Sequence, residues 1–314
     1  MRSRVSLKAF LAFVLALIVS AAILLQVEGS SPALRPGEAT AVRSSFAFDS
    51  QGAARFLQGL STSSGLLREY PNSGTIYLSD DQQLDYAALM KLGDFYAAGK
   101  INSTMRAVLG GLYGNFSSAA CSYGNWNGVD VVLGVYVPIP CRHSDWNEFS
   151  GHDVLLSWNA SKLPGSGGFV VKETTWTGAM DDGYAQYADL ELYYSVNQLH
   201  FGNYVEAVRA FEHANAMWDG RGFADRASQA SNEYTSFKLA LDLIAFKALM
   251  NNSQTEGSVV GYNPTLNQVQ SVMSKLQGSD GGVFTNYLIT NGQVVVPSNT
   301  YRNGETTSLF VLAE

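Results

Sequence analysis

The sequence predicts a mainly α-helical fold of helical hairpins in two layers, with a small antiparallel β insertion around residues 121–178. Two helical segments predict the layers: residues 203–218 are amphipathic, whereas residues 233–250 are apolar nearly all round. A half-exposed helix beside a buried one is what an outer and an inner layer require. The insertion is predicted by β-rich segments at 128–140, 152–158 and 167–176.

A helix-to-loop pattern that occurs three times predicts the hairpins. Residues 56–70 and 275–287 share Leu-Gln-Gly, then a glycine with two apolar residues, then a tyrosine, and residues 215–226 contain Asp-Gly-x-Gly-Phe. We expect a glycine to form a left-handed C-cap and the apolar pair to anchor the following loop. The segment 275–287 follows a helix and lacks the Lys-Ser/Thr of a phosphate loop, so the repeat indicates αα hairpins rather than a nucleotide site.

The remaining helices are predicted from apolar spacing. They are expected at residues 50–60, 84–99, 101–114, 181–200, 265–277 and 305–314. Asp80 and Asp81 precede the second of these, where acidic residues favour a helix start.

The N-terminus predicts export. Arg2, Arg4 and Lys8 precede an apolar run at residues 9–25, which is typical of a signal anchor and also compatible with a cleaved signal peptide. We therefore expect an anchor or signal at 1–27, a flexible stalk at 28–45 and an ectodomain at 46–314.

Composition and cysteines agree with export. Without residues 1–27 the chain has 17 basic and 27 acidic residues, a net charge of −10, which argues against a nucleic-acid partner. Cys121 and Cys141 are expected to form a disulfide outside the cell, the alternative being two free buried thiols. Four N-x-S/T sequons mark possible glycans, at Asn102, Asn115, Asn159 and Asn251.

Several of these segments resemble the six-hairpin glycosidase-like superfamily of α/α toroids, and membrane-tethered archaeal surface proteins built on that plan. The similar segments are "GLLREY", "SDDQQLDYAALMKLGD", "YADLELYY", "MWDGRGF", "DGGVF" and "ETTSLFVLA". The resemblance implies that residues 46–314 form a ring of inner and outer helices with a cleft at one end. It implies a carbohydrate partner and no cofactor.

Hydrolysis of a glycoside requires two carboxyl groups that flank the scissile bond. The candidates are Asp81 before a predicted helix, Asp182 and Asp189 in the helix at 181–200, and Glu305 in a connecting loop. Asp182 and Asp189 are expected on one stripe of the helix at 181–200, about 10 Å apart along its axis. Ordinary helix capping is the competing interpretation of the acids that precede helices.

Other residues near these acids could hold a sugar. They are Arg68, Tyr70, Tyr187, Trp218 and Asp280, although core packing is the competing interpretation for the aromatic ones, and Asp280 could instead bond to its own glycine turn. His143 and His152 lack zinc-ligand spacing, so no metal site is predicted. Two hypotheses follow: a glycoside hydrolase, or a non-catalytic surface protein that binds glycans or has a structural role.

Overall fold

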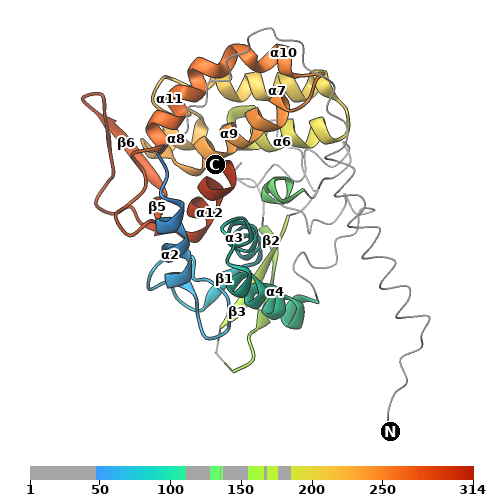
Figure 1. Ribbon diagram of the computed structural model, residues 1–314, viewed down its shortest axis with the longest axis vertical. Helices are drawn as coiled ribbons and strands as arrows, with labels where there is room; N and C mark the ends of the chain where they lie inside the picture. The colour runs from blue at the N-terminus through green and yellow to red at the C-terminus, as the bar shows by residue number, and fades with distance from the viewer. Residues whose placement is uncertain (1–46, 111–127, 135, 137–154, 166–167, 176–184) are drawn as a thin grey trace, which may run out of the picture. The chain divides into compact units, whose positions relative to one another are not determined.

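The computed structural model describes residues 47–110, 128–134, 136, 155–165, 168–175 and 185–314 (Figure 1). These residues belong to one compact unit, residues 44–314. The predicted anchor and stalk, the two cysteines and Asp182 lie outside the described residues. Within the described part of the chain, no helix combines the length and apolarity needed to cross a membrane.

The fold is mainly helical, as predicted. Four buried helices contact one another in the order α3, α12, α9, α6, and Figure 1 shows α12 between α3 and α9. They are α3 (Ser79–Lys91), α12 (Gly304–Ala313), α9 (Phe237–Met250) and α6 (Ala188–His200). Each buries residues on several sides, which is why their sequences lack a single apolar stripe.

Four helices with a single apolar side cover this buried group. Helix α2 (Ser50–Leu60) contacts α3 and α12, and α4 (Phe95–Leu109) contacts α3. Helix α7 (Tyr204–Ala216) contacts α6 and α9, and α11 (Asn263–Met273) contacts α9. Short helical turns complete the set: η1 (Gly128–Leu133), α8 (Arg226–Ser231), α10 (Glu256–Val259) and η4 (Val260–Tyr262).

The three repeated loops have the same backbone hydrogen bonds. Each loop closes through an antiparallel bridge: Ser61 with Leu67, Trp218 with Phe223, and Gln277 with Val283. In each, the residue after the bridge donates its N–H to the carbonyl of the residue before it, at 2.8–3.0 Å; these bonds are Arg68 to Leu60, Ala224 to Met217 and Phe284 to Leu276. The predicted repeat is therefore confirmed as a repeated loop structure.

The expected glycine C-caps are wrong. Helix α2 is capped by Ser61, and α7 and α11 end on Met217 and Ser274, none of them left-handed. The left-handed glycines lie inside the loops instead, namely Gly65, Gly220 and Gly281, with φ of 84°, 87° and 92°. Glycine is needed where the loop reverses, because the bridge that follows requires a tight turn.

The β insertion is confirmed in part. Strands β2 (Leu155–Lys162) and β3 (Phe169–Thr175) are antiparallel, as predicted. However, β1 (Ile76–Leu78), which precedes α3, pairs with β3 in parallel, so the sheet is mixed rather than purely antiparallel. The predicted strand at 128–140 begins as the 3₁₀ turn η1.

Two smaller sheets connect the later helices. Strand β4 (Tyr234–Thr235) pairs with β6 (Asn286–Thr290), which pairs with β7 (Gln293–Val295). Strand β5 (Val283–Phe284) pairs with β8 (Arg302–Asn303), directly before α12. These short strands lead the chain from the third repeated loop to the start of α12.

Some predicted helix boundaries are wrong. The expected helices at 84–99 and 101–114 are α3 and α4, which are separated at Gly93 (φ 80°) and capped anew by Asp94, whose side chain accepts from the Ala97 N–H. The expected helix at 181–200 begins only at Ala188, after an extended Tyr187. Asp189 therefore lies in the first turn of α6, and Asp182 lies outside the described residues.

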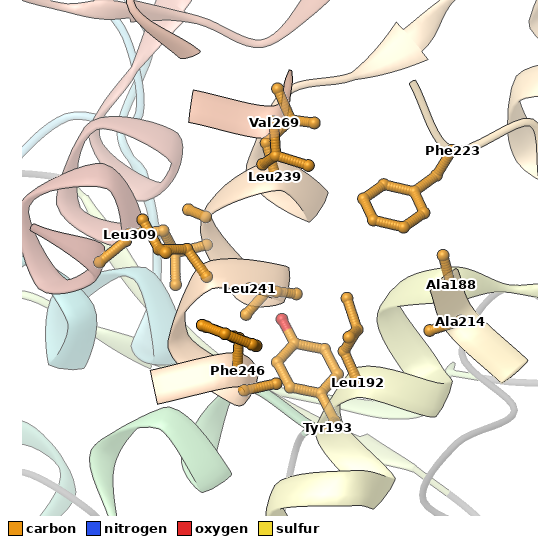
Figure 2. Packing of buried hydrophobic residues seen from close by; sticks show 14 of the residues in the cluster. Ala188, Leu192, Tyr193, Ala214, Phe223, Leu239, Leu241, Phe246, Val269 and Leu309 are labelled. Atoms are coloured by element: carbon orange, nitrogen blue, oxygen red, sulfur yellow. The ribbon is translucent and has the colours of Figure 1, made fainter. Parts of the chain in front are cut away.

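Buried apolar side chains form two clusters. One is built mainly on α6, α7, α9 and α11, and Figure 2 shows Tyr193, Leu241 and Phe246 together within it. The other joins α2, α3 and α4 to β1 and β3. Helix α12 contributes to both, with Leu309 and Phe310 in the first and Val311 in the second. Helix α12 therefore packs against both clusters.

Candidate active site

Acidic side chains gather where the N-termini of α3 and α12 meet. Asp80 and Asp81 lie in the first turn of α3, and Glu305 lies in the first turn of α12. The Gly304 N–H donates to the Glu69 carbonyl at 2.7 Å, which joins the loop before β1 to the start of α12. Partial positive charge at two helix N-termini favours acidic groups here.

Asp85 explains why the two helices approach closely. Its carboxylate accepts a 2.7 Å hydrogen bond from the Ser308 hydroxyl of α12. A Cβ at Gly304 would lie only 3.1 Å from the Asp85 Oδ1, so a larger residue there would require the Asp85 side chain to shift. The sequence Gly304-Glu305 thus places the Glu305 side chain beside the first turn of α3.

The carboxyl groups of this acid cluster (Glu69, Asp80, Asp81, Asp85 and Glu305) act on one another electrostatically. Burial raises the pKa of Asp81 well above its usual value, and repulsion from the other four acids raises it further. Burial, with repulsion from neighbouring acids, raises the pKa of Glu305 to about 8. Because each ionisation makes the next one harder, the five carboxyl groups titrate as a coupled set.

Asp81 has the environment of a reactive group. Its side chain is 5% exposed, and within the described residues its carboxylate makes no hydrogen bond or ion pair. Burial raises the pKa of Asp80 as well, and the backbone N–H groups of Asp80 and Asp81 counteract this. The N-cap of α3 is Leu78 and no side chain caps this helix, so the capping interpretation accounts for neither Asp80 nor Asp81.

Two tyrosines border the acid cluster. The rings of Tyr70 and Tyr301 lie 4.8 Å apart with planes tilted by 43°. The pKa of Tyr301 is raised by partial burial and then by Glu69, Tyr70, Glu305 and Asp81, which locates its hydroxyl beside these acids. Tyr301 is 47% exposed, so its ring is available to a ligand that approaches the carboxyl groups.

Asp189 belongs to a different group. The Lys238 ammonium lies 3.2 Å from Asp189 and bonds to Asp225, and all three side chains are buried. Burial raises the pKa of Asp189 and the lysine counteracts this; for Lys238, the two carboxylates outweigh burial and raise the pKa. These contacts join α6, α8 and α9 and give Asp189 a structural role apart from the acid cluster, and its catalytic role stays an untested prediction.

The predicted sugar-binding residues do not share one site. Tyr70 borders the acid cluster, whereas Tyr187 is buried at the start of α6. Trp218 bonds to Gln268 at 3.1 Å and packs edge-on against Phe223, which is a packing role. Arg68 follows the first repeated loop, where its N–H donates to the Leu60 carbonyl.

Asp280 also has local partners. It accepts from the Gly282 N–H at 3.2 Å and pairs with Arg302 at 3.2 Å. The alternative interpretation of Asp280, a bond to its own glycine turn, is therefore confirmed.

Sequence reasoning missed Asp85, Tyr301 and Lys238. Lys238 was the easiest of the three to find, because a lysine inside the apolar helix at 233–250 requires a partner of opposite charge. Tyr301 lies in a short loop with no pattern of its own. Within the described residues, no three carboxylate, imidazole or thiol side chains are arranged to hold a metal ion.

Comparisons with known proteins add no relative. No protein-family model matches the chain, and no curated protein matches its sequence.

Proposed function

We propose that this protein is an exported, membrane-tethered enzyme that hydrolyses glycosidic bonds with Asp81 and Glu305. The observation that carries the proposal is the pairing of these two carboxyl groups, 224 positions apart in the chain, in one electrostatically coupled cluster. Coupled acids with raised pKa values are typical of glycosidases, which need one protonated and one ionised carboxyl group at the same pH.

The roles follow from the two environments. With a pKa of about 8, Glu305 keeps its proton at neutral pH and can donate it to the leaving oxygen of a glycoside as general acid. The Asp81 carboxyl group, which makes no hydrogen bond within the described residues, is the proposed second group, and in its ionised form it would support the positive charge that develops on the sugar or activate water. The neighbouring acids favour retention of the Glu305 proton until a substrate arrives.

Tyr70 and Tyr301 are the proposed sugar contacts. Aromatic faces pack against the apolar faces of sugar rings, and Tyr301 offers an exposed ring beside the carboxyl groups. We also propose that the two helical layers close into an α/α toroid. In support, η1 contacts both α3 and α6, the two ends of the buried row of helices.

The experiment that tests this function is release of reducing ends from a panel of polysaccharides by the purified ectodomain. We expect Asp81→Asn and Glu305→Gln each to lower the rate at least 100-fold, because general acid–base catalysis contributes about 10²–10⁴-fold. Glu212→Gln, an exposed position on α7, is the matched control and should keep the wild-type rate.

Three results decide between the hypotheses. Folded variants that retain activity would contradict the assignment of the two carboxyl groups. Polysaccharide binding without cleavage by the wild-type protein would contradict the enzyme hypothesis and support a non-catalytic surface protein. Circular dichroism of each variant separates lost activity from lost folding.

A further inference from the structure

A second pocket lies between the ends of α7 and α8 and the turn before α6, and it shares no residue with the acid cluster. Its volume is about 590 Å³, within the range of small-molecule sites. Its lining combines small apolar side chains with polar and charged ones: Ala185, Gln186, His213, Ala216, Met217, Ala224, Asp225, Arg226 and Gln229.

The one carboxylate among these lining residues is already engaged. Asp225 Oδ1 accepts from the Ser228 N–H at 3.1 Å, and Oδ2 accepts from the Ala188 N–H at 3.1 Å and from the Lys238 ammonium. These donors offset the negative charge of Asp225, so Asp225 repels an anion in the pocket only weakly.

Arg226 supplies an available positive charge. Its side chain is exposed at the start of α8, and within the described residues it forms no ion pair with a carboxylate. Its guanidinium lies 6.0 Å from the centre of the Tyr187 ring, a position that restricts its orientation. In a chain of net charge −7, an arginine that lines a pocket and has no carboxylate partner within the described residues favours an anionic ligand.

His213 supplies a second donor. Its Nδ1 bonds to Glu191 at 2.8 Å, and the Glu191 side chain is fully buried, so the imidazole is held in one orientation. The His213 side chain is 43% exposed, and Nε2 makes no hydrogen bond within the described residues. Burial raises the pKa of Glu191, and a protonated Glu191 that donates to Nδ1 leaves the ring proton on Nε2, where it can be donated to a ligand.

We infer that this pocket binds a small anionic ligand, a sugar-sized molecule with a carboxylate or phosphate group held by Arg226 and His213. The fork of the arginine side chain fits two oxygens of either group. Gln186 and Gln229 offer amides for hydroxyl groups, and Ala216 and Met217 offer an apolar wall. The inference stands on geometry separate from the proposed active site.

Calorimetric titration of the full chain tests this inference, with glucuronate and inorganic phosphate as probes and glucose as the neutral control. We expect at least one anionic probe to bind and glucose to bind at least tenfold more weakly. Preference for glucuronate indicates a sugar acid, and preference for phosphate indicates a phosphorylated ligand. Arg226→Gln should weaken the bound probe at least tenfold, whereas Arg55→Gln, an exposed arginine on α2, should leave binding unchanged.

His213→Gln should also weaken binding, and the ring signal of His213 in NMR spectra should shift with the bound probe. The inference is overturned if neither anion binds, or if the Arg226→Gln protein binds as tightly as the wild type. Asp81→Asn should bind the probe normally, so failure of this pocket and failure of the proposed active site are distinguishable.

Discussion

Asp242 lies at the centre of the buried helix α9, where Asn215 donates to its Oδ1 at 2.9 Å. Burial raises the pKa of Asp242 to about 7, above its value of about 3.9 in an unfolded chain. The folded protein therefore holds this proton more tightly than the unfolded chain. Its contribution to stability is fully present below about pH 4 and is lost as the pH rises to about 7.

Asp242→Asn should therefore flatten the dependence of stability on pH. A shift of about three pKa units corresponds to up to about 4 kcal/mol, so the variant should gain stability relative to wild type between pH 4 and pH 8. Urea denaturation at several pH values measures this. Parallel pH profiles for the two proteins would contradict a raised pKa at Asp242.

Lys238 is a second buried residue whose charge requires a partner of opposite sign. It stands between Asp189 and Asp225, and all three side chains are nearly inaccessible to water. Lys238→Met removes the cation and leaves two buried carboxylates without it, which should cost about 3–5 kcal/mol of unfolding free energy. Asp189→Asn in the same protein should recover part of the loss, and no recovery would contradict a direct charge interaction.

The repeated loops are the element that sequence predicted best. Their shared glycine and apolar pattern reflects a backbone structure, and Gly65, Gly220 and Gly281 each occupy a left-handed position. The predicted role of glycine as a helix cap was wrong, because a left-handed residue can serve a helix end or a turn equally well. Only the hydrogen bonds of the loop distinguish the two.

Gly281 and Gly220 allow a test of how closely the third repeated loop packs against α2, because both glycines are left-handed but differ in their surroundings. A Cβ at Gly281 would lie 2.0 Å from the Gly52 carbonyl oxygen of α2, whereas a Cβ at Gly220 would have no atom within 4 Å. Gly220→Ala should cost only the left-handed strain of about 1–2 kcal/mol. Gly281→Ala should cost more, because α2 must also move. Equal losses in thermal unfolding would contradict the close contact between this loop and α2.

Helix boundaries were less predictable than the loops. The acidic and apolar residues of 84–114 are compatible with more than one set of helix boundaries. Helix α3 ends just before the left-handed Gly93, and Asp94 then forms the N-cap of α4. Tyr187 is extended because its neighbour Ala188 donates to Asp225, a residue 37 positions away. Such a long-range contact cannot be inferred from local spacing.

At the scale of the whole molecule, the active-site proposal depends on which helices become neighbours. The sequence marked all three acids as candidates: Asp81 before a helix, Glu305 in a connecting loop and Asp189 inside the helix expected at 181–200. The packing of α3 against α12, through Asp85, Ser308 and Gly304, brings Asp81 and Glu305 into one acid cluster. Asp189 lies elsewhere, where the Lys238 ammonium offsets its charge. Burial and neighbours, rather than residue type, assign these roles.

The central claim is that Glu305 keeps its proton near neutral pH because it shares a buried site with other acids. Carbon-13 NMR of protein labelled at the glutamate carboxyl groups tests this without knowledge of any substrate. We predict a carboxyl signal that titrates near pH 8 and disappears in Glu305→Gln, whereas Glu212→Gln removes only a signal other than this one. A Glu305 signal that titrates near the usual pKa of about 4.3 would contradict the account.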